Sequence, residues 1–263
     1  MNRNLSCRIL TAIFLTLFLT LLFLPFVSAF TVDSVFLKVA LRQGESVSKT
    51  IKLTADSTSD FKLETTGLDG LLVVEEKQFS LSAGETKILQ LAFGDVEKAY
   101  EPGIYAGGLT ITSSKMIKKI PVVVELETED VLFDVNLNVP VAYETVAPGK
   151  NFIVDITVFN LENIGTKAVK MTYLVRGFSG DTILSESENV AIGNSASMTK
   201  AIEIPKGIEP GEYVFAATSA YQNTLGTSSH LFKVALQTEQ TGLGYIIIVI
   251  AVILVIVIYL VIY

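Results

Sequence analysis

Hydrophobic side chains recur at every second position along much of the chain between residues 30 and 240, and this alternation constrains the fold more than any other feature. In VLFDVNLNVPV, residues 131–141, every odd-numbered residue is hydrophobic and most of the others are polar. SVFLKVALR, residues 34–42, repeats the pattern. A period of two places one face of an extended strand in a core. The sequence therefore predicts an all-β fold, with Pro140 at a sheet edge or at a crossing between sheets because it has no N–H to donate.

One phrase occurs twice, as EPGIYAGGLTI at residues 101–111 and as EPGEYVFAATS at residues 209–219. A glycine turn precedes it at similar spacing each time, since Gly44 lies 61 residues before Tyr105 and Gly149 lies 64 residues before Tyr213. Short alternating strands separated by turn residues are typical of immunoglobulin-like β-sandwiches. We predict two such sandwiches in tandem, over residues 30–128 and 129–237, with the boundary in the acidic segment at residues 127–130.

The repeated phrase also predicts a tyrosine corner in each sandwich. Pro-Gly favours a tight type II turn, and the tyrosine two residues later begins the next strand. Its ring then joins the core, while its hydroxyl bonds back to the backbone. We interpret these residues as structural rather than functional. They are Pro102, Gly103, Tyr105, Pro210, Gly211 and Tyr213.

The first 29 residues are typical of a secretory signal peptide. Arg3 and Arg8 give a positive start, residues 9–24 are apolar, and Pro25 then breaks the helix. Small residues follow, which predicts cleavage after Ala29; an uncleaved signal anchor is the alternative. Cys7, the only cysteine, would leave with the signal, so the mature chain would have no disulfide and no thiolate.

YIIIVIAVILVIVIYLVIY, residues 245–263, predicts a transmembrane α-helix. Its 19 residues contain no charge or helix breaker, and as a helix they would extend about 28 Å, close to the thickness of the bilayer core. A sheet strand of this length is uncommon. Tyr245, Tyr259 and Tyr263 are the predicted anchors at the membrane interface. Residues 238–244 would form a juxtamembrane hinge. With no basic tip, a retained anchor is favoured over one removed for lipid attachment.

The charge balance excludes one class of partner. The whole chain has 20 Lys+Arg and 27 Asp+Glu, a net charge of −7, which becomes −9 once Arg3 and Arg8 leave with the signal. Such an acidic protein is a poor match for nucleic acid or for anionic lipid headgroups. We therefore predict no nucleic-acid partner.

Residues suited to catalysis are scarce. The one histidine, His230, stands at the entry to the last predicted strand and is interpreted as a polar residue at a strand edge. Glu75 and Glu76 are adjacent, so on a strand they would point to opposite faces and could not cooperate. The sequence predicts no catalytic residue, no cofactor and no transition-metal site. We accordingly predict that the protein is not an enzyme.

Three further sites stay open from the sequence. One is a calcium site formed by the connector carboxylates Glu127, Glu129 and Asp130. Another is a contact for an acidic polymer formed by Lys115, Lys118 and Lys119 at a predicted hairpin tip. The third is a sugar-binding surface, which the absence of tryptophan disfavours. Gly107 and Gly108 are followed by a strand rather than a helix, so they mark a bulge or close sheet packing and not a phosphate loop.

Residues 131–236 resemble CARDB-type and galactosidase-associated immunoglobulin-like domains of prokaryotic, membrane-anchored surface proteins. Turn positions carry the resemblance, namely Pro148-Gly149, Asn160, Gly165, Gly180-Asp181 and Pro210-Gly211-x-Tyr213. The resemblance implies a surface-exposed adhesion, spacer or accessory module, and it brings no catalytic residue.

The sequence thus favours a single-pass protein of the cell membrane, with its ectodomain outside the cytoplasm. Its two sandwiches would serve as a spacer or as an adhesion and protein-interaction module, with the bilayer and a surface protein as partners. The alternatives are an accessory subunit that docks in a membrane complex through its C-terminal span, and a carbohydrate-binding module.

Overall fold

The computed structural model describes residues 29–68, 70–94 and 100–236, together with Ile250 and Leu254. Residues Ser28–Leu236 cluster as one compact unit. The predicted signal peptide, juxtamembrane hinge and transmembrane helix lie outside the described residues, apart from those two isolated positions. Within the described part of the chain, no helix is both long enough and apolar enough to cross a bilayer.

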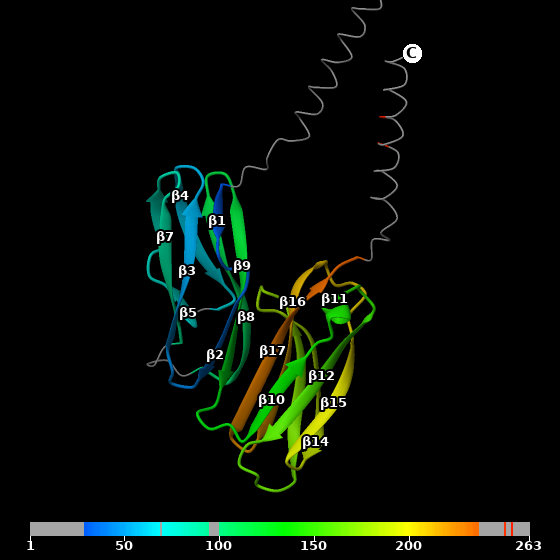
Figure 1. The fold of residues 1–263 in the computed structure, drawn as a ribbon. Helices are drawn as coiled ribbons and strands as arrows, with labels where there is room; N and C mark the ends of the chain where they lie inside the picture. The colour runs from blue at the N-terminus through cyan, green and yellow to red at the C-terminus, as the bar shows by residue number, and fades with distance from the viewer. Residues whose placement is uncertain (1–28, 69, 95–99, 237–249, 251–253, 255–263) are drawn as a thin grey trace, which may run out of the picture. The chain divides into compact units, whose positions relative to one another are not determined.

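The strands of the N-terminal sandwich, β1 to β9, form two sheets (Figure 1). One is four-stranded, in the order β1-β3-β7-β5, and the other is five-stranded, in the order β2-β9-β8-β4-β6. The strands are β1 (Phe30–Val32), β2 (Leu37–Arg42), β3 (Val47–Ala55), β4 (Ser59–Thr66), β5 (Leu72–Val74), β6 (Gln78–Leu81), β7 (Thr86–Phe93), β8 (Gly103–Ser113) and β9 (Ile117–Glu127).

The C-terminal sandwich has a three-stranded sheet, in the order β10-β12-β15, and a second five-stranded sheet, in the order β11-β17-β16-β13-β14. One short 3₁₀ helix, η1 (Val141–Tyr143), precedes β11. The strands are β10 (Phe133–Asn138), β11 (Thr145–Val146), β12 (Asn151–Asn160), β13 (Lys167–Arg176), β14 (Thr182–Ile192), β15 (Ser195–Glu203), β16 (Gly211–Tyr221) and β17 (Thr224–Val234).

The two sandwiches share one topology. In each, the last strand pairs antiparallel with the strand that begins within the repeated phrase, and parallel with a short early strand: β9 pairs with β2, and β17 with β11. In each, the opposite sheet contains an antiparallel trio, β1-β3-β7 in the first and β10-β12-β15 in the second, and in the first β5 adds a fourth strand. The glycine turns also match, because Gly44 and Gly149 both have positive φ, at 80° and 75°. The sequence repeat is therefore a repeat of structure.

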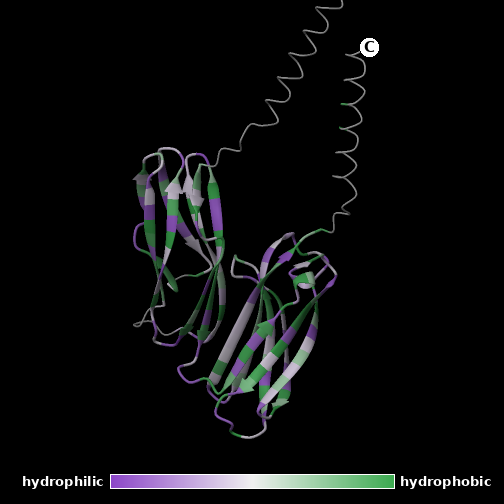
Figure 2. Cartoon of the chain, in the orientation of Figure 1, coloured by the Kyte–Doolittle hydropathy of each residue, from purple (hydrophilic) through white to green (hydrophobic). Residues whose placement is uncertain are grey.

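Each sandwich has its own hydrophobic core, and the alternation of side chains explains both. Leu53 and Leu91 of the four-stranded sheet meet Leu109 and Val122 of the first five-stranded sheet. In the second sandwich the corresponding core is centred on buried residues such as Phe152 of β12. Hydrophobic and hydrophilic residues alternate along the strands in Figure 2. The prediction of an all-β fold is confirmed for the described residues. That each half is an independent domain stays a prediction.

Two local predictions each left two alternatives, and the structure decides between them. Pro140 lies at a crossing between sheets and not at a sheet edge, because β10 of the three-stranded sheet ends at Asn138 and η1, directly after Pro140, leads to β11 of the five-stranded sheet. Gly107 marks no bulge, because the pairing of β8 with both neighbours runs without a shift. Close packing, the other predicted alternative, is the reason for this glycine. A Cβ there would collide with the Thr66 carbonyl and the Leu68 side chain, which cross the strand at this point.

A polar cluster ties the two sheets of the C-terminal sandwich together at their open side. The Tyr173 hydroxyl of β13 donates to Glu188 Oε1 of β14 at 2.8 Å, and Lys200 Nζ of β15 lies 2.6 Å from the same oxygen. Lys200 also stands over the Tyr173 ring, 5.0 Å from its centroid. Because β14 and β15 belong to different sheets, Glu188 and Lys200 clasp the edges of the sandwich.

This clasp predicts a pH dependence of stability. Lys200, and then Tyr173, hold the pKa of the Glu188 carboxyl below its ordinary value. A lowered pKa contributes stability above the pKa of the unfolded chain, and this contribution is lost as the pH falls through the folded pKa. We expect Glu188→Gln to lower stability at pH 7 by less than about 1 kcal/mol, since the pair is partly exposed. The deficit should shrink between about pH 5 and pH 3.

Urea unfolding midpoints, measured from pH 7 to pH 3, provide the check. Glu186→Gln is the matched control, because Glu186 lies on the same strand and makes no ion pair in the described structure. A deficit for Glu188→Gln that stays constant down to pH 3 would argue against the clasp.

Candidate functional site at the interface between the two sandwiches

The repeated phrase leads into strands that are buried on both faces. In β8, Tyr105, Leu109 and Ile111 point into the N-terminal core, whereas Ile104 and Ala106 belong to a separate apolar cluster. In β16 the same alternation sends Phe215 into the C-terminal core. The outward residues of both strands therefore cover something other than their own core.

The outward residues of β8 and those of β16 cover each other. Buried residues of the N-terminal sandwich and of the C-terminal sandwich form one hydrophobic cluster, which we call the interface cluster. Its buried members are Ile104, Ala106, Val123, Val214 and Ala216, and four partly buried side chains pack against it: Phe36, Leu174, Phe178 and Leu231. The small side chains at its centre allow the two five-stranded sheets to pack face to face.

Two basic side chains pin the interface beside this cluster. Arg176 Nη1, at the end of β13, donates to the Ile104 carbonyl of β8 at 2.6 Å. Lys38 Nζ of β2 donates to the Ser229 carbonyl of β17 at 2.8 Å and pairs with Glu125 Oε1 at 2.8 Å. The Glu125 side chain is only 8% exposed, so without Lys38 its charge would be buried alone, which is costly.

Hydrogen bonds also hold the connector between the sandwiches, residues 127–130, in place. Thr128 exchanges hydrogen bonds with the backbone of Leu225, and Glu127 Oε1 accepts the Thr227 N–H at 3.0 Å. Burial raises the pKa of the Glu127 carboxyl. Ser219 Oγ donates to the Phe133 carbonyl, and a Cβ at Gly226 would collide with that carbonyl. The connector thus lies directly against β16 and β17.

The predicted tyrosine corners lie at the start of the interface strands. Tyr105 Oη donates to the Glu101 carbonyl at 2.7 Å, and Tyr213 Oη donates to the Glu209 carbonyl at 2.8 Å. Both rings are half-buried against their cores. Burial raises the pKa of both phenols, with Glu101 and Glu209 as the respective second causes.

The type II turn predicted for Pro-Gly is wrong. Gly103 and Gly211 are the first residues of β8 and β16, paired with Leu126 and Val234. Gly103 has a φ of 157°, which side chains rarely adopt, but Gly211 is not among the residues with positive φ. The chain therefore enters the strand directly at each proline, without the left-handed glycine that a type II turn requires.

The other candidate residues do not converge on a site. His230 lies inside β17 rather than at its entry, opposite Phe215, and burial lowers the pKa of its imidazole. Glu76 pairs with Lys87 at 2.6 Å and lies in the connection between β5 and β6, not on a strand. Among the described residues, no group of three or more His, Cys, Asp or Glu is placed to hold a metal ion.

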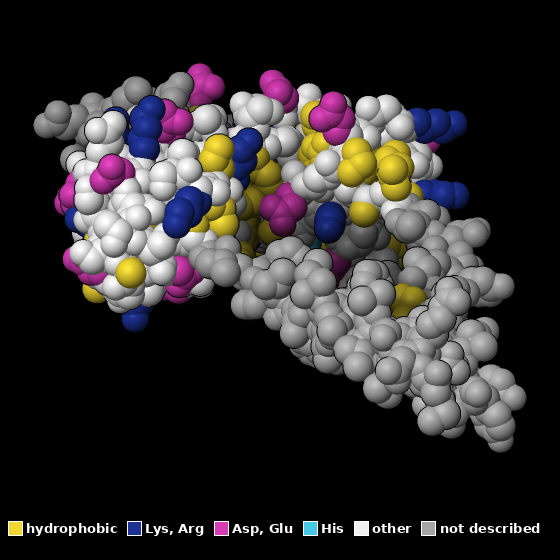
Figure 3. Space-filling model, turned by 90° about the horizontal axis from the view of Figure 1, so that it is seen from above, with side chains coloured by type: hydrophobic (Ala, Val, Ile, Leu, Met, Phe, Trp, Pro, Cys, Tyr) yellow, Lys and Arg dark blue, Asp and Glu magenta, His cyan; other side chains and the backbone are white. Residues whose placement is uncertain are grey.

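The three lysines near the β8–β9 hairpin also have different surroundings and do not form one basic site. Lys115 Nζ reaches Ser57 Oγ at 3.3 Å, and Lys118 Nζ reaches the Val32 carbonyl at 3.5 Å. Lys119 lines a crevice of about 700 Å³ beside the interface cluster, together with Phe178 and Glu212. Basic and acidic side chains are interspersed on the face shown in Figure 3, which offers no single-sign surface.

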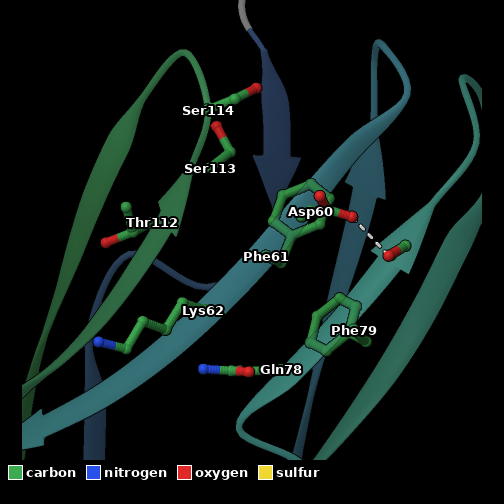
Figure 4. Close-up of a pocket in the computed structure, with 9 residues that line it drawn as sticks. Asp60, Phe61, Lys62, Gln78, Phe79, Thr112, Ser113 and Ser114 are labelled. Carbon is green, nitrogen blue, oxygen red and sulfur yellow. Dashed lines mark hydrogen bonds between the residues drawn. The ribbon is translucent and has the colours of Figure 1, made fainter.

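An open pocket of about 610 Å³ lies on the N-terminal sandwich, over β4, β6 and β8 (Figure 4). Its charged groups already have partners. Asp60 Oδ1 accepts from Ser80 Oγ at 2.5 Å, and Lys62 Nζ pairs with Glu64 at 2.5 Å. The phenyl rings of Phe61 and Phe79 stack against each other, with centroids 5.4 Å apart. The pocket is therefore an open depression over a packed core rather than a set of groups awaiting a ligand.

The sequence carried a signal for the interface that the alternation argument missed. PVVVEL, residues 121–126, is continuously apolar up to Glu125, which is typical of a strand buried on both faces. The small residues after each tyrosine, in YAGG and YVFAATSA, are also unusual for strands with one solvent-facing side. Neither pattern says which other surface the outer face meets.

No protein-family model matches the chain, and no curated protein matches it. Solved structures do resemble it. A Porphyromonas gingivalis W83 protein of unknown function is 14% identical, with a TM-score of 0.43, and covers 79% of this chain and all of its own. The CARDB domain of a Pyrococcus furiosus protein, solved in complex with di-metal ions, is 18% identical, with a TM-score of 0.29, and covers 40% of this chain and 94% of its own.

The periplasmic chaperone SfaE is 11% identical, with a TM-score of 0.30, and covers 79% of this chain and all of its own. One structural neighbour is thus a CARDB domain, as the sequence resemblance suggested, but these values assign neither a family nor an activity.

The corner hydrogen bonds give a direct test of the role of the tyrosines. We expect Tyr213→Phe to destabilise the C-terminal sandwich by about 1 kcal/mol, because it removes one hydrogen bond and leaves the Glu209 carbonyl without its donor. The unfolding midpoint in urea, at unchanged slope, measures this. Tyr143→Phe is the control, since the Tyr143 ring packs against the same core and its hydroxyl has no partner in the described structure. An unchanged midpoint for Tyr213→Phe would contradict the corner.

Proposed function

We propose that this protein is a non-enzymatic, membrane-anchored protein of the cell surface, in which two immunoglobulin-like sandwiches act as one stiff unit. The unit holds an interaction surface away from the bilayer. Its partner is another protein at the surface, met through exposed loops and sheet edges, where such scaffolds place recognition. The C-terminal span of residues 245–263 is the proposed anchor.

The interface cluster is the observation that carries this proposal. Tandem sandwiches joined only by a linker would move independently. Here Ile104, Val123 and Val214 are buried between the sandwiches, and Arg176 and Lys38 bond across the junction. A spacer that must project its far end needs this kind of fixed junction, whereas a flexible tether does not.

Stiffness predicts a narrow distance distribution between the sandwiches. The described residues contain no cysteine, so spin labels can be placed at Ile88→Cys and Phe159→Cys, both exposed, in full-length protein carrying Cys7→Ser. We expect pulsed electron paramagnetic resonance to give one narrow peak, and Arg176→Met to broaden it by removing the bond to Ile104. Lys49→Met, at an exposed site of β3, should leave the peak unchanged. A broad distribution of label-to-label distances in the parent protein would contradict the proposal that the two sandwiches form one stiff unit.

Partner capture separates the proposed module from an accessory subunit that docks through its span. The full-length protein is crosslinked in its native membranes, and the captured proteins are identified by mass spectrometry. The experiment is then repeated with residues 245–263 replaced by an unrelated apolar span. We expect the same partners in both, because the sandwiches make the contact. Loss of the partners after the exchange would instead favour docking through the span.

A further inference from the structure

One end of the C-terminal sandwich gathers the segments that lie next to the start of the predicted hinge. The Lys233 N–H donates to the Glu144 carbonyl at 2.8 Å, and the Ala235 N–H donates to the Val146 carbonyl at 3.0 Å. The end of β17 is thereby fixed beside η1 and β11. We call the surface formed by residues 141–150, 203–207 and 233–236 the stem end.

The loops of the stem end are bonded to one another. The Gly149 N–H donates to the Ile204 carbonyl at 2.8 Å, and the Ile204 N–H donates to the Lys150 carbonyl at 3.0 Å. The Lys206 side chain packs over Gly149, where a Cβ would meet it at 2.8 Å. These hydrogen bonds make the stem end one continuous surface rather than a set of separate loops.

Two apolar side chains project from this surface. Val141, in η1, is 80% exposed, and Leu236 is 69% exposed. Neighbouring exposed charges have both signs, with Lys150 and Lys206 against Glu144 and Glu203. A surface with apolar tips and balanced charge is better suited to contact with the interfacial region of a bilayer than to contact with a strongly charged partner.

The length of the chain beyond Leu236 limits what can face the stem end. Eight residues, 237–244, separate it from the predicted span. Fully extended they reach about 28 Å, and as a flexible chain they average about 16 Å end to end. A bilayer that holds residues 245–263 would therefore lie within contact range of Val141 and Leu236.

We propose that the stem end is a lipid-contacting foot, which inserts Val141 and Leu236 among the headgroups of the bilayer. This inference rests on the membrane anchor proposed above. The contact would set the stiff unit upright on the membrane instead of leaving it to swing on residues 237–244. Because the contact is apolar, it should persist at high salt.

The test uses full-length Cys7→Ser protein reconstituted into phosphatidylcholine nanodiscs. A polarity-sensitive nitrobenzoxadiazole fluorophore is attached at Val141→Cys or, as the matched control, at Val35→Cys, which is 77% exposed in the N-terminal sandwich. Lipids with a nitroxide near the headgroup serve as the quencher. We expect emission from position 141 to shift to the blue and to be quenched at least about twofold more than emission from position 35, in low and high salt alike.

Each outcome is decisive. Equal quenching at both positions in protein that has entered nanodiscs overturns the foot and leaves the anchor standing. Failure of the protein to enter nanodiscs overturns the anchor, and the foot with it. Quenching at position 141 that disappears in high salt contradicts an apolar contact. Leu236→Cys, labelled in the same way, should behave like position 141, and a label there that resembles position 35 would count against the proposal.

Discussion

The outer faces of the two five-stranded sheets are apolar, and the rest of the described structure depends on burying them. A single sandwich hides one face of each sheet and leaves the other to solvent. In this chain Val123 and Val214 lie on those second faces, so each sandwich needs a further apolar surface. Each supplies that surface to the other. Burial of Glu125 and its pairing with Lys38 then follow from the same contact.

The internal repeat explains how one topology provides both a core and an interface. In both copies the repeated phrase starts a central strand of a five-stranded sheet, where a tyrosine hydroxyl bonds to the carbonyl four residues earlier. The residues after the tyrosine then alternate between the core and the partner sandwich. The two copies differ in the side chains that bond across the junction. Lys38 reaches out from the first copy, and Arg176 reaches back from the second.

These features give the proposed function a mechanical rather than a chemical basis. The charged groups of the structure stabilise edges, as Glu188 and Lys200 do, or junctions, as Arg176 and Lys38 do. A fixed junction transmits orientation from one end of the unit to the other, so a contact made at the stem end would set the direction in which the far loops point. In the proposed function, anchoring, stiffness and presentation would be three aspects of one arrangement.

The sequence by itself determined the strands and their repeat, but not the geometry of the Pro-Gly segments. Alternation predicted an all-β fold because a strand has a period of two, and the repeated phrase and the glycine turns at Gly44 and Gly149 predicted two similar halves because turn chemistry is local. Only the tertiary structure decided which surfaces and which charged groups meet. Alternation separates the inward side chains of a strand from the outward ones, but it does not say what covers the outward face, so it did not show that Val214 is buried against the other sandwich. The partners of Arg176, Lys38 and Glu188 lie on strands far away in the chain or in another sheet, and only folding brings them within bonding distance.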